Sequence, residues 1–256
     1  MYIYRLKQTA MRVRVLFTAI LLATLTSFAQ TTNNDITLTA REFGLVSISK
    51  DIHSATINGQ TYYYTLVDGK RDLAVIVAKK KAYKDFKEVV LPETFTSSEG
   101  TTLTIVGIGD KAFEKCKNIK KVDLPKTIRI IGNEAFCNAD VDDLTLREGL
   151  IKIGNNAFFN NDLKDIHIPD GVEEIGELAF YCFKSTIFQR SGSGTLYIPK
   201  SVYSIGDKAF AMTRNGYGAW FNSKRKILCL PDHVNLDNCK KMGISKEPVE
   251  EYLKGK

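Results

Sequence analysis

The feature that most constrains the fold of this chain is a short segment that recurs five times. It reads I-G-x-x-A-F, and its glycines lie 23, 22, 22 and 30 residues apart. A fixed period of roughly 20–50 residues indicates a repeat architecture, in which each unit buries its apolar face only against its neighbours. The five copies begin at Ile108, Ile131, Ile153, Ile175 and Ile205.

A second segment alternates with the first and predicts one short strand per repeat. Its copies lie at 89–92, 122–125, 144–147, 166–169, 196–199 and 228–231, and five of the six end in proline. Apolar residues two positions apart point to one side of a strand, and proline ends the strand because it cannot donate to a sheet. The glycine of the first segment permits a sharp corner.

The rest of the I-G-x-x-A-F segment predicts a turn and a core position. Asp110, Asn133, Asn155 and Asp207 are suitable caps for a single helical turn. The small alanine would allow close approach of neighbouring repeats, while the phenylalanine fills the interior. We therefore expect one stacked ladder of Phe113, Phe136, Phe158, Phe180 and Phe210.

These motifs together resemble the BspA-like family of bacterial leucine-rich repeats, in which I-G-x-x-A-F is followed by L-x-x-V-x-I-P. The similarity runs from about residue 86 to residue 231 and departs from the pattern at Arg147, which stands where proline is expected. Longer segments also follow Pro92, Tyr181 and Met212. The resemblance implies a right-handed leucine-rich-repeat solenoid with a parallel β-sheet and short helical turns.

The two ends of this solenoid should be covered by other structure. Residues 30–85 predict a β-rich N-terminal cap, because Asn58-Gly59 between two β-prone segments is a strong hairpin signal. Asp68-Gly69 predicts a second turn before a strand over 73–78. The solenoid would occupy 86–234, and 235–256 would form a C-terminal cap or tail with a short helical stretch over 248–253.

Residues 1–29 predict a signal peptide and hence export. Basic residues up to Arg14 precede an apolar run over 15–25, and small residues then lead to a cleavage site after Ala29. A membrane anchor would need about 20 apolar residues, and the run over 15–25 is only about half as long. We expect a mature protein without a transmembrane segment that is extracellular, at the cell surface or periplasmic.

The charge balance and the cysteines exclude some classes of protein. Once residues 1–29 are set aside, 32 Lys and Arg face 29 Asp and Glu, which gives no reason to expect a nucleic-acid partner. The five cysteines are odd in number and form no C-x-x-C pair, so a disulfide framework is not expected. We interpret Cys116, Cys137 and Cys182, which follow the repeat phenylalanines by one to three residues, as structural thiols.

Sequence motifs for catalysis are absent, and we expect neither an enzyme nor a cofactor. The chain has no G-x-S-x-G, Walker or H-E-x-x-H segment, and its three histidines have no companions at motif spacing. Cys229, His233 and Cys239 would be an incomplete metal-ligand set, because a fourth ligand is missing. We expect no metal site.

Outward-facing strand positions are the first candidates for ligand binding. Equivalent residues of stacked strands lie about 4.8 Å apart, so two columns are expected. The first column contains Glu88, Lys121, Asp143, Asp165, Thr195 and Ile227. The second contains Val90, Asp123, Thr145, His167, Tyr197 and Cys229. Asp123, Asp143, Asp165 and His167, with Tyr197 beside them, could hold a cation or a basic ligand group. The alternative is a solvated face in which Lys121 offsets Asp143.

The insertion at 214–221 is the second candidate, since it carries the only tryptophan between glycines. Loops on rigid scaffolds often carry function, which makes Tyr217 and Trp220 possible ligand contacts. The same segment could instead fold over the last repeat.

The sequence therefore favours an exported, non-catalytic binding or surface-display module. Some members of the family that it resembles adhere to host matrix proteins, which implies a host extracellular protein or a glycan as ligand. The alternative is a structural spacer or assembly component of a cell-envelope complex.

Overall fold

The chain divides into two units, residues 1–39 and 40–256. The computed structural model describes residues 49–255 except 162, 184–193, 215–216 and 220–225, so the fold below is that of the second unit. The predicted signal peptide lies outside the described residues. Within the described ranges, no helix is long and apolar enough to span a membrane.

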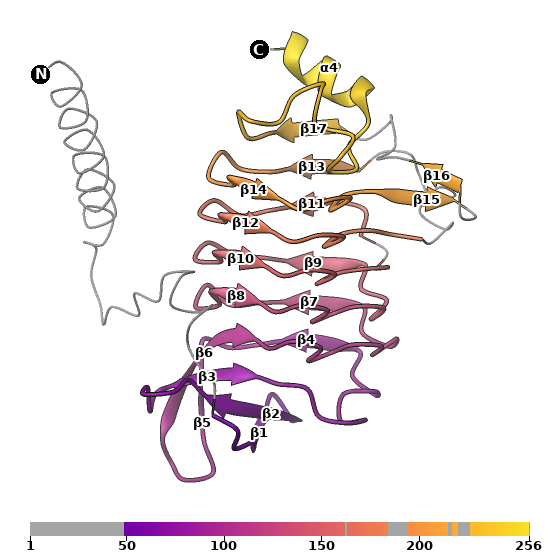
Figure 1. Cartoon of the computed structure of the whole chain (residues 1–256). Helices are drawn as coiled ribbons and strands as arrows, with labels where there is room; N and C mark the ends of the chain where they lie inside the picture. Colours follow the sequence, from indigo (N-terminus) through magenta and orange to yellow (C-terminus); the bar gives the residue numbers. More distant parts are fainter. Residues whose placement is uncertain (1–48, 162, 184–193, 215–216, 220–225, 256) are drawn as a thin grey trace, which may run out of the picture. The chain divides into compact units, whose positions relative to one another are not determined.

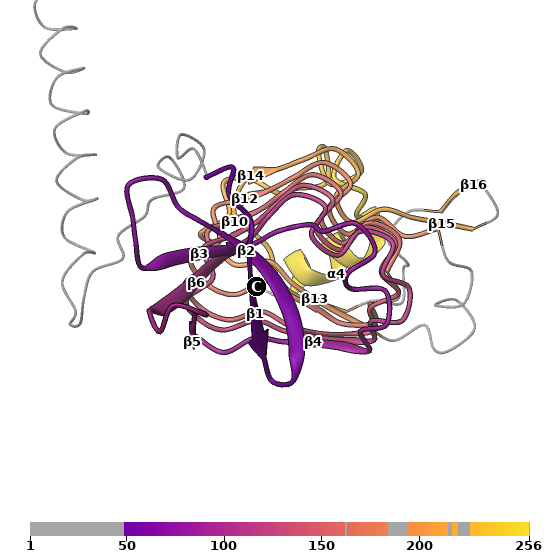
Figure 2. The same cartoon turned by 90° about the horizontal axis from the view of Figure 1, so that it is seen from below.

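The strands that lead into the I-G segments of successive repeats pair in parallel within one sheet. Its strands β6 (Thr102–Ile108), β8 (Ile130–Ile131), β10 (Lys152–Ile153), β12 (Glu174–Ile175) and β14 (Ser204–Ile205) follow one another in sequence order. Ile108, Ile131, Ile153, Ile175 and Ile205 are in register. In Figure 1 these strands lie one above another, and in Figure 2 the repeats seen end-on nearly overlay.

The second motif also forms parallel strands, but in two separate sheets. One contains β4 (Glu88–Val90), β7 (Lys121–Asp123) and β9 (Asp143–Thr145), and the other contains β11 (Ile166–His167), β13 (Thr195–Tyr197) and β17 (Lys226–Cys229). One predicted column is wrong at its end, because Thr195 pairs with Lys226 and not with Ile227, which is buried. A register shift after Leu196 then restores the predicted pair of Tyr197 and Cys229.

The predicted phenylalanine ladder forms the centre of the core. Neighbouring rings from Phe113 to Phe210 stack with centroids 5.0, 5.3, 5.3 and 5.5 Å apart and planes within 12°. Tyr83 extends the ladder toward the N-terminus, with its ring centroid 4.7 Å from that of Phe113. The repeats therefore share one continuous apolar interior.

The predicted helical turns are not present at the I-G-x-x-A-F segments. Lys111, Glu134, Asn156, Leu178 and Lys208 all have positive φ, between 54° and 57°, which no helical turn contains. The reason lies in the hydrogen bonds, because alternate backbone N–H groups donate to the next repeat. The N–H of Lys111 donates to the carbonyl of Asn133 at 2.9 Å, and that of Phe113 donates to Ala135 at 2.7 Å.

The predicted cap residues likewise join repeats instead of capping helices. The Asn133 N–H donates to Asp110 Oδ1 at 2.7 Å, and the Asn155 N–H donates to Asn133 Oδ1 at 2.9 Å. The Glu177 N–H continues the series by donating to Asn155 Oδ1 at 2.8 Å. Each side chain thus satisfies a backbone donor of the following repeat.

The N-terminal β structure merges with the repeats. β1 (His53–Ile57) and β2 (Gln60–Leu66) form the predicted hairpin, with positive φ at Asn58 and Gly59. β3 (Leu73–Ile76) pairs antiparallel with β2 but parallel with β6, so repeat-like pairing begins before residue 86. β5 (Thr94–Thr96), from the longer segment after Pro92, pairs antiparallel with β6.

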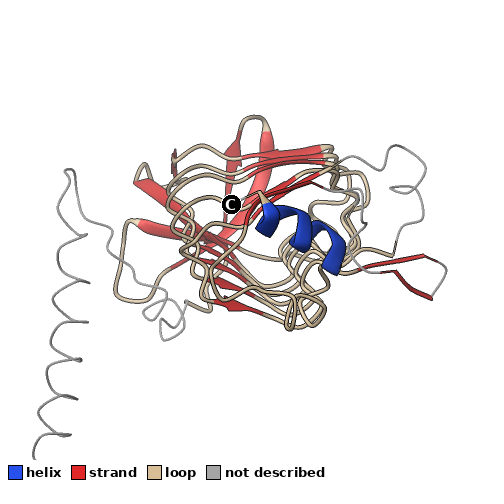
Figure 3. Cartoon of the chain, turned by 90° about the horizontal axis from the view of Figure 1, so that it is seen from above, coloured by secondary structure: helices blue, strands red, loops and turns tan. Residues whose placement is uncertain are grey.

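At the other end, α4 (Lys246–Lys254) confirms the predicted helical stretch and is the only helix within the described residues. Val249 is fully buried in the common core, and Figure 3 shows the helix lying across the last repeats. The insertion contains an antiparallel hairpin, β15 (Met212–Arg214) and β16 (Tyr217–Ala219), which extends to the side of the repeats in Figure 1.

Candidate binding surface

The predicted acidic residues of the first outward sheet are engaged by basic side chains or lie beside them. Asp143 is in register with Lys121, as the sequence pattern indicated. Asp123 forms an ion pair with the Arg147 guanidinium, which also donates to the Leu124 carbonyl at 2.8 Å. The hydrogen bond to Asp123 raises the pKa of Arg147. The arginine that replaces the expected proline therefore ties its repeat to the preceding one.

The second outward sheet carries an aromatic and polar cluster, which we call the β11–β13 patch: Asp165, His167, Asp170, Thr195 and Tyr197. The His167 ring stacks on the Tyr197 ring with centroids 4.4 Å apart and planes 13° apart. The backbone N–H and the hydroxyl of Thr195 donate to Asp165 Oδ1 at 2.7 and 2.8 Å. His167 and Asp165 are exposed, so the patch faces solvent.

A hydrogen bond also fixes the tyrosine of the patch. The Tyr197 hydroxyl donates to Asp170 Oδ1 at 3.2 Å. Desolvation and then the negative charge of Asp170 raise the pKa of Tyr197. The phenol therefore stays a neutral donor over the physiological range, and the patch offers stacked rings, a hydroxyl and carboxylates in a fixed arrangement.

The structure places the four candidate residues for a cation or a basic ligand group in two separate sheets. Asp123 and Asp143 belong to the β4–β7–β9 sheet, whereas Asp165 and His167 belong to the separate β11–β13–β17 sheet. Among the residues that the structure describes, no group of three His, Cys, Asp or Glu side chains could hold a metal ion. Asp123 and Asp165 already accept from Arg147 and Thr195.

The insertion is described only in part. Tyr217 begins β16, where its backbone pairs with Arg214, and Trp220 lies outside the described residues. The role predicted for these two residues as ligand contacts stays a prediction.

Five lysines between residues 79 and 87 form a basic segment. The same region of the fold is rich in carboxylates. Asp85 lies within the segment, and the neighbouring Lys120 and Lys115 form ion pairs with Asp140 and Glu114. The local charges are thus mixed, and the segment does not form a uniform basic surface.

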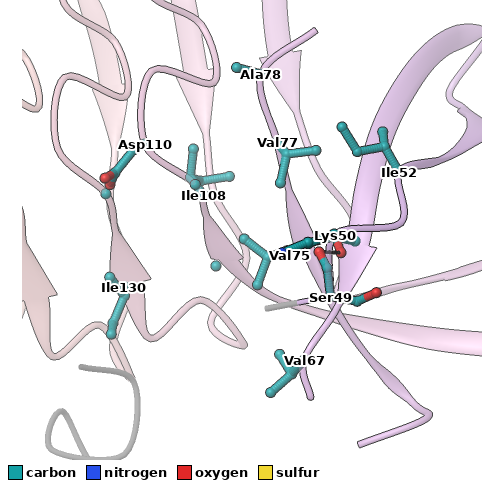
Figure 4. A pocket seen from close by; sticks show the side chains of 14 residues that line it. Ser49, Lys50, Ile52, Val67, Val75, Val77, Ala78, Ile108, Asp110 and Ile130 are labelled. Carbon is teal, nitrogen blue, oxygen red and sulfur yellow. Dashed lines mark hydrogen bonds between the residues drawn. The ribbon is translucent and has the colours of Figure 1, made fainter. Parts of the chain in front are cut away.

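An apolar groove at the N-terminal end of the repeats was also missed. It has a volume of about 590 Å³ and is lined by Ile52, Val67, Val75, Val77, Ile130 and their neighbours (Figure 4). The sequence did contain a signal for it, because residues 73–78 are continuously apolar. Such a run is typical of a strand that is buried on both faces.

Comparisons with solved structures find bacterial leucine-rich-repeat proteins. The T. pallidum leucine rich repeat protein is 22% identical, with 76% of this chain and 92% of that chain covered and a TM-score of 0.50. A leucine-rich repeat protein from Bacteroides capillosus is 27% identical, with coverages of 48% and 86% and a TM-score of 0.41. The pneumococcal vaccine antigen PcpA is 18% identical, with coverages of 69% and 50% and a TM-score of 0.43.

This chain thus spans half the length of the pneumococcal antigen. The likeness to the T. pallidum protein supports the leucine-rich-repeat fold. The search of curated proteins finds no match. Residues 106–215 match the profile described as "BspA type Leucine rich repeat region", in six copies. This part of the chain therefore belongs to the BspA-type leucine-rich-repeat family, as the sequence motifs predicted.

Proposed function

We propose that this chain is an exported, non-catalytic binding module displayed at the cell surface, with a host extracellular protein or a glycan as its ligand. The proposal includes the right-handed solenoid course and the signal peptide predicted from the sequence. It builds on the family, since leucine-rich-repeat regions are binding modules that use extended sheet surfaces.

The observation that carries the proposal is the β11–β13 patch. Its rings are stacked at 4.4 Å and its hydroxyl and carboxylates are held by hydrogen bonds, so little conformational entropy would be lost when a ligand binds. Tyrosine and other aromatic residues are enriched at protein interfaces. Leu228, on the adjacent strand β17, is 45% exposed and adds an apolar contact.

A second candidate function is a structural spacer or assembly unit of an envelope complex. It is favoured by the charge pairing on other outward positions. Lys152 Nζ lies 2.7 Å from Glu174 Oε2 and Asp123 pairs with Arg147, both between neighbouring repeats. Such pairs neutralise the surface and leave few charges to attract a ligand.

A pull-down with residues 30–256 separates the two candidates. The bait is offered host matrix proteins in one arm and an envelope extract of the producing cell in the other. The variants are Trp220→Ala, the double change Asp143→Ala/Asp165→Ala, and the control Glu250→Ala on the exposed side of α4.

Capture of a matrix protein or its glycan, with loss in either test variant and not in the control, is the result we expect. Capture of envelope proteins alone would refute the adhesion proposal and favour the spacer. Protease treatment of intact cells is the second readout, because a displayed module is cleaved and a periplasmic one is protected.

A further inference from the structure

The apolar groove lies on the outer face of the sheet, away from the common core. Val67 and Val75 are only 2% and 5% exposed, yet neither belongs to the interior cluster that holds Ala74 and Ile76. Alternate residues of a strand point to opposite faces, so Val75 and Val77 face outward while Ile76 faces inward. Figure 4 shows Val75, Val77 and Ile52 among the side chains that line this groove.

The apolar character of this outer face ends abruptly along the sheet. Gly107, Ile130, Lys152 and Glu174 occupy consecutive register positions, and the last two form an ion pair at 2.7 Å. The groove therefore covers β3, β6 and β8 but not β10. Its occupant must be short and must approach from the N-terminal end of the repeats.

The described chain begins at the groove itself. The Ser49 N–H donates to the Leu66 carbonyl at 3.1 Å, and the Thr65 hydroxyl donates to the Ser49 carbonyl at 2.6 Å. Ser49 and Lys50 both line the groove. Residues 40–48 are thus joined to the chain at the wall of the groove.

The chemistry and length of residues 40–48 suit the groove. Their sequence is A-R-E-F-G-L-V-S-I, in which Phe43, Leu45, Val46 and Ile48 are apolar. Arg41 and Glu42 could meet Asp110 and Lys50, the charged residues of the lining. Nine extended residues reach about 30 Å, and three strands span only about 10 Å from first to last.

We propose that residues 40–48 dock in this groove and place the side chains of Phe43 and Leu45 against Val75 and Val77. The groove is then an intramolecular docking site that covers the outer face of the first repeats. It is distinct from the β11–β13 patch and is closed to external ligands. Signal-peptide cleavage after Ala29 would leave the docking segment on the mature chain.

Hydrogen–deuterium exchange followed by mass spectrometry tests the proposal on residues 30–256. We expect the amides of 40–48 to exchange at least tenfold more slowly than those of 31–39. Phe43→Asp and, independently, Val77→Asp should abolish this difference. Val77 is half-buried and outside the core, so the charge does not enter the interior; unchanged exchange in β8 and β10 verifies that the repeats remain folded.

Two matched controls should leave the protection intact. Thr32→Asp places the same charge in the N-terminal segment but outside 40–48, and Ser204→Asp places it on the polar part of the same outer face. Equal exchange of 40–48 and 31–39 in the unaltered chain would overturn the proposal. Protection that survives both test variants, or that increases with protein concentration and so indicates a second copy in the groove, would overturn it as well.

Discussion

The rings of Phe136 and Phe158 lie parallel within 2°, with their centroids 5.3 Å apart. The two residues are 22 positions apart and occupy the same place in consecutive repeats. The strands that precede these two phenylalanines pair in register. The sequence period of 22 residues therefore places the two rings at about the distance between neighbouring strands of a sheet. Both rings are essentially inaccessible to solvent, so the ladder should be a main source of stability.

Replacing Phe158 by alanine should lower the free energy of unfolding by about 3–5 kcal/mol, because a ladder ring is lost and a cavity remains between two rigid neighbours. Urea denaturation measures the change. Phe183→Ala is the control, since Phe183 is 50% exposed and lies outside the ladder. Equal losses in the two variants would contradict the role of the ladder.

Asn161 should be more important for stability than the exposed asparagines of the turns. Its side chain is buried, accepts from the Val141 N–H at 2.8 Å and donates to the Phe136 carbonyl at 2.8 Å. Asn161→Ala leaves the buried Val141 N–H unpaired, at about 1–3 kcal/mol, whereas the Phe136 carbonyl keeps the hydrogen bond from the Ala139 N–H at 3.2 Å. Asn155→Ala removes one exposed acceptor and should cost about 1 kcal/mol. The reverse order in thermal denaturation would show that the buried network contributes little.

The repeat glycines should tolerate no side chain where neighbouring turns meet. A methyl group on Gly154 would lie 2.7 Å from the Asn133 nitrogen and 2.7 Å from the Gly132 carbonyl carbon, and neither backbone atom can move freely. Gly154→Ala should therefore destabilise the fold by about 1–3 kcal/mol or more. Gly255→Ala is the control: the nearest atom to its added methyl group, the Tyr252 carbonyl oxygen, is 3.7 Å away, so no change in melting temperature is expected. A stable Gly154→Ala protein would mean that the turns can separate.

Stability should fall at high pH partly through Cys116. Desolvation raises the pKa of this thiol from 9.0 to about 11, so between these values the unfolded chain has lost a proton that the folded chain retains. The free energy of unfolding therefore decreases as the pH rises from 9 to 11, and the full contribution is present below pH 9. Urea denaturation across this range should show a shallower decrease for Cys116→Ala. If the free energy of unfolding decreased equally steeply with pH in both proteins, the loss of stability would come from other groups. Tyr83 is one such group, because burial also raises its pKa.

Much of this fold could be predicted from the sequence because its main determinants are local and periodic. The ladder, the parallel strands, the Asn58-Gly59 hairpin and the C-terminal helix follow from spacing and residue type. The turns could not be predicted in this way. Asn155 after glycine is compatible with a helix cap, and only the neighbouring repeat shows that it accepts from Glu177 instead.

The binding surface was less predictable, since it depends on pairing between distant strands. A register shift after Leu196 determines which residue lies opposite Thr195. Arg147, from the following repeat, forms an ion pair with Asp123. His167 and Tyr197 were placed in one column correctly, because that column follows the repeat period alone.

The most direct test of the central claim, that the repeats form a scaffold for a recognition face, is the affinity of the chain for its captured partner with and without the aromatic pair of the β11–β13 patch. His167→Ala/Tyr197→Ala should weaken binding at least tenfold, about 1.4 kcal/mol, while repeat folding measured by circular dichroism is unchanged. Undiminished affinity in this variant, or the absence of any partner in both the matrix and the envelope arms, would contradict the account.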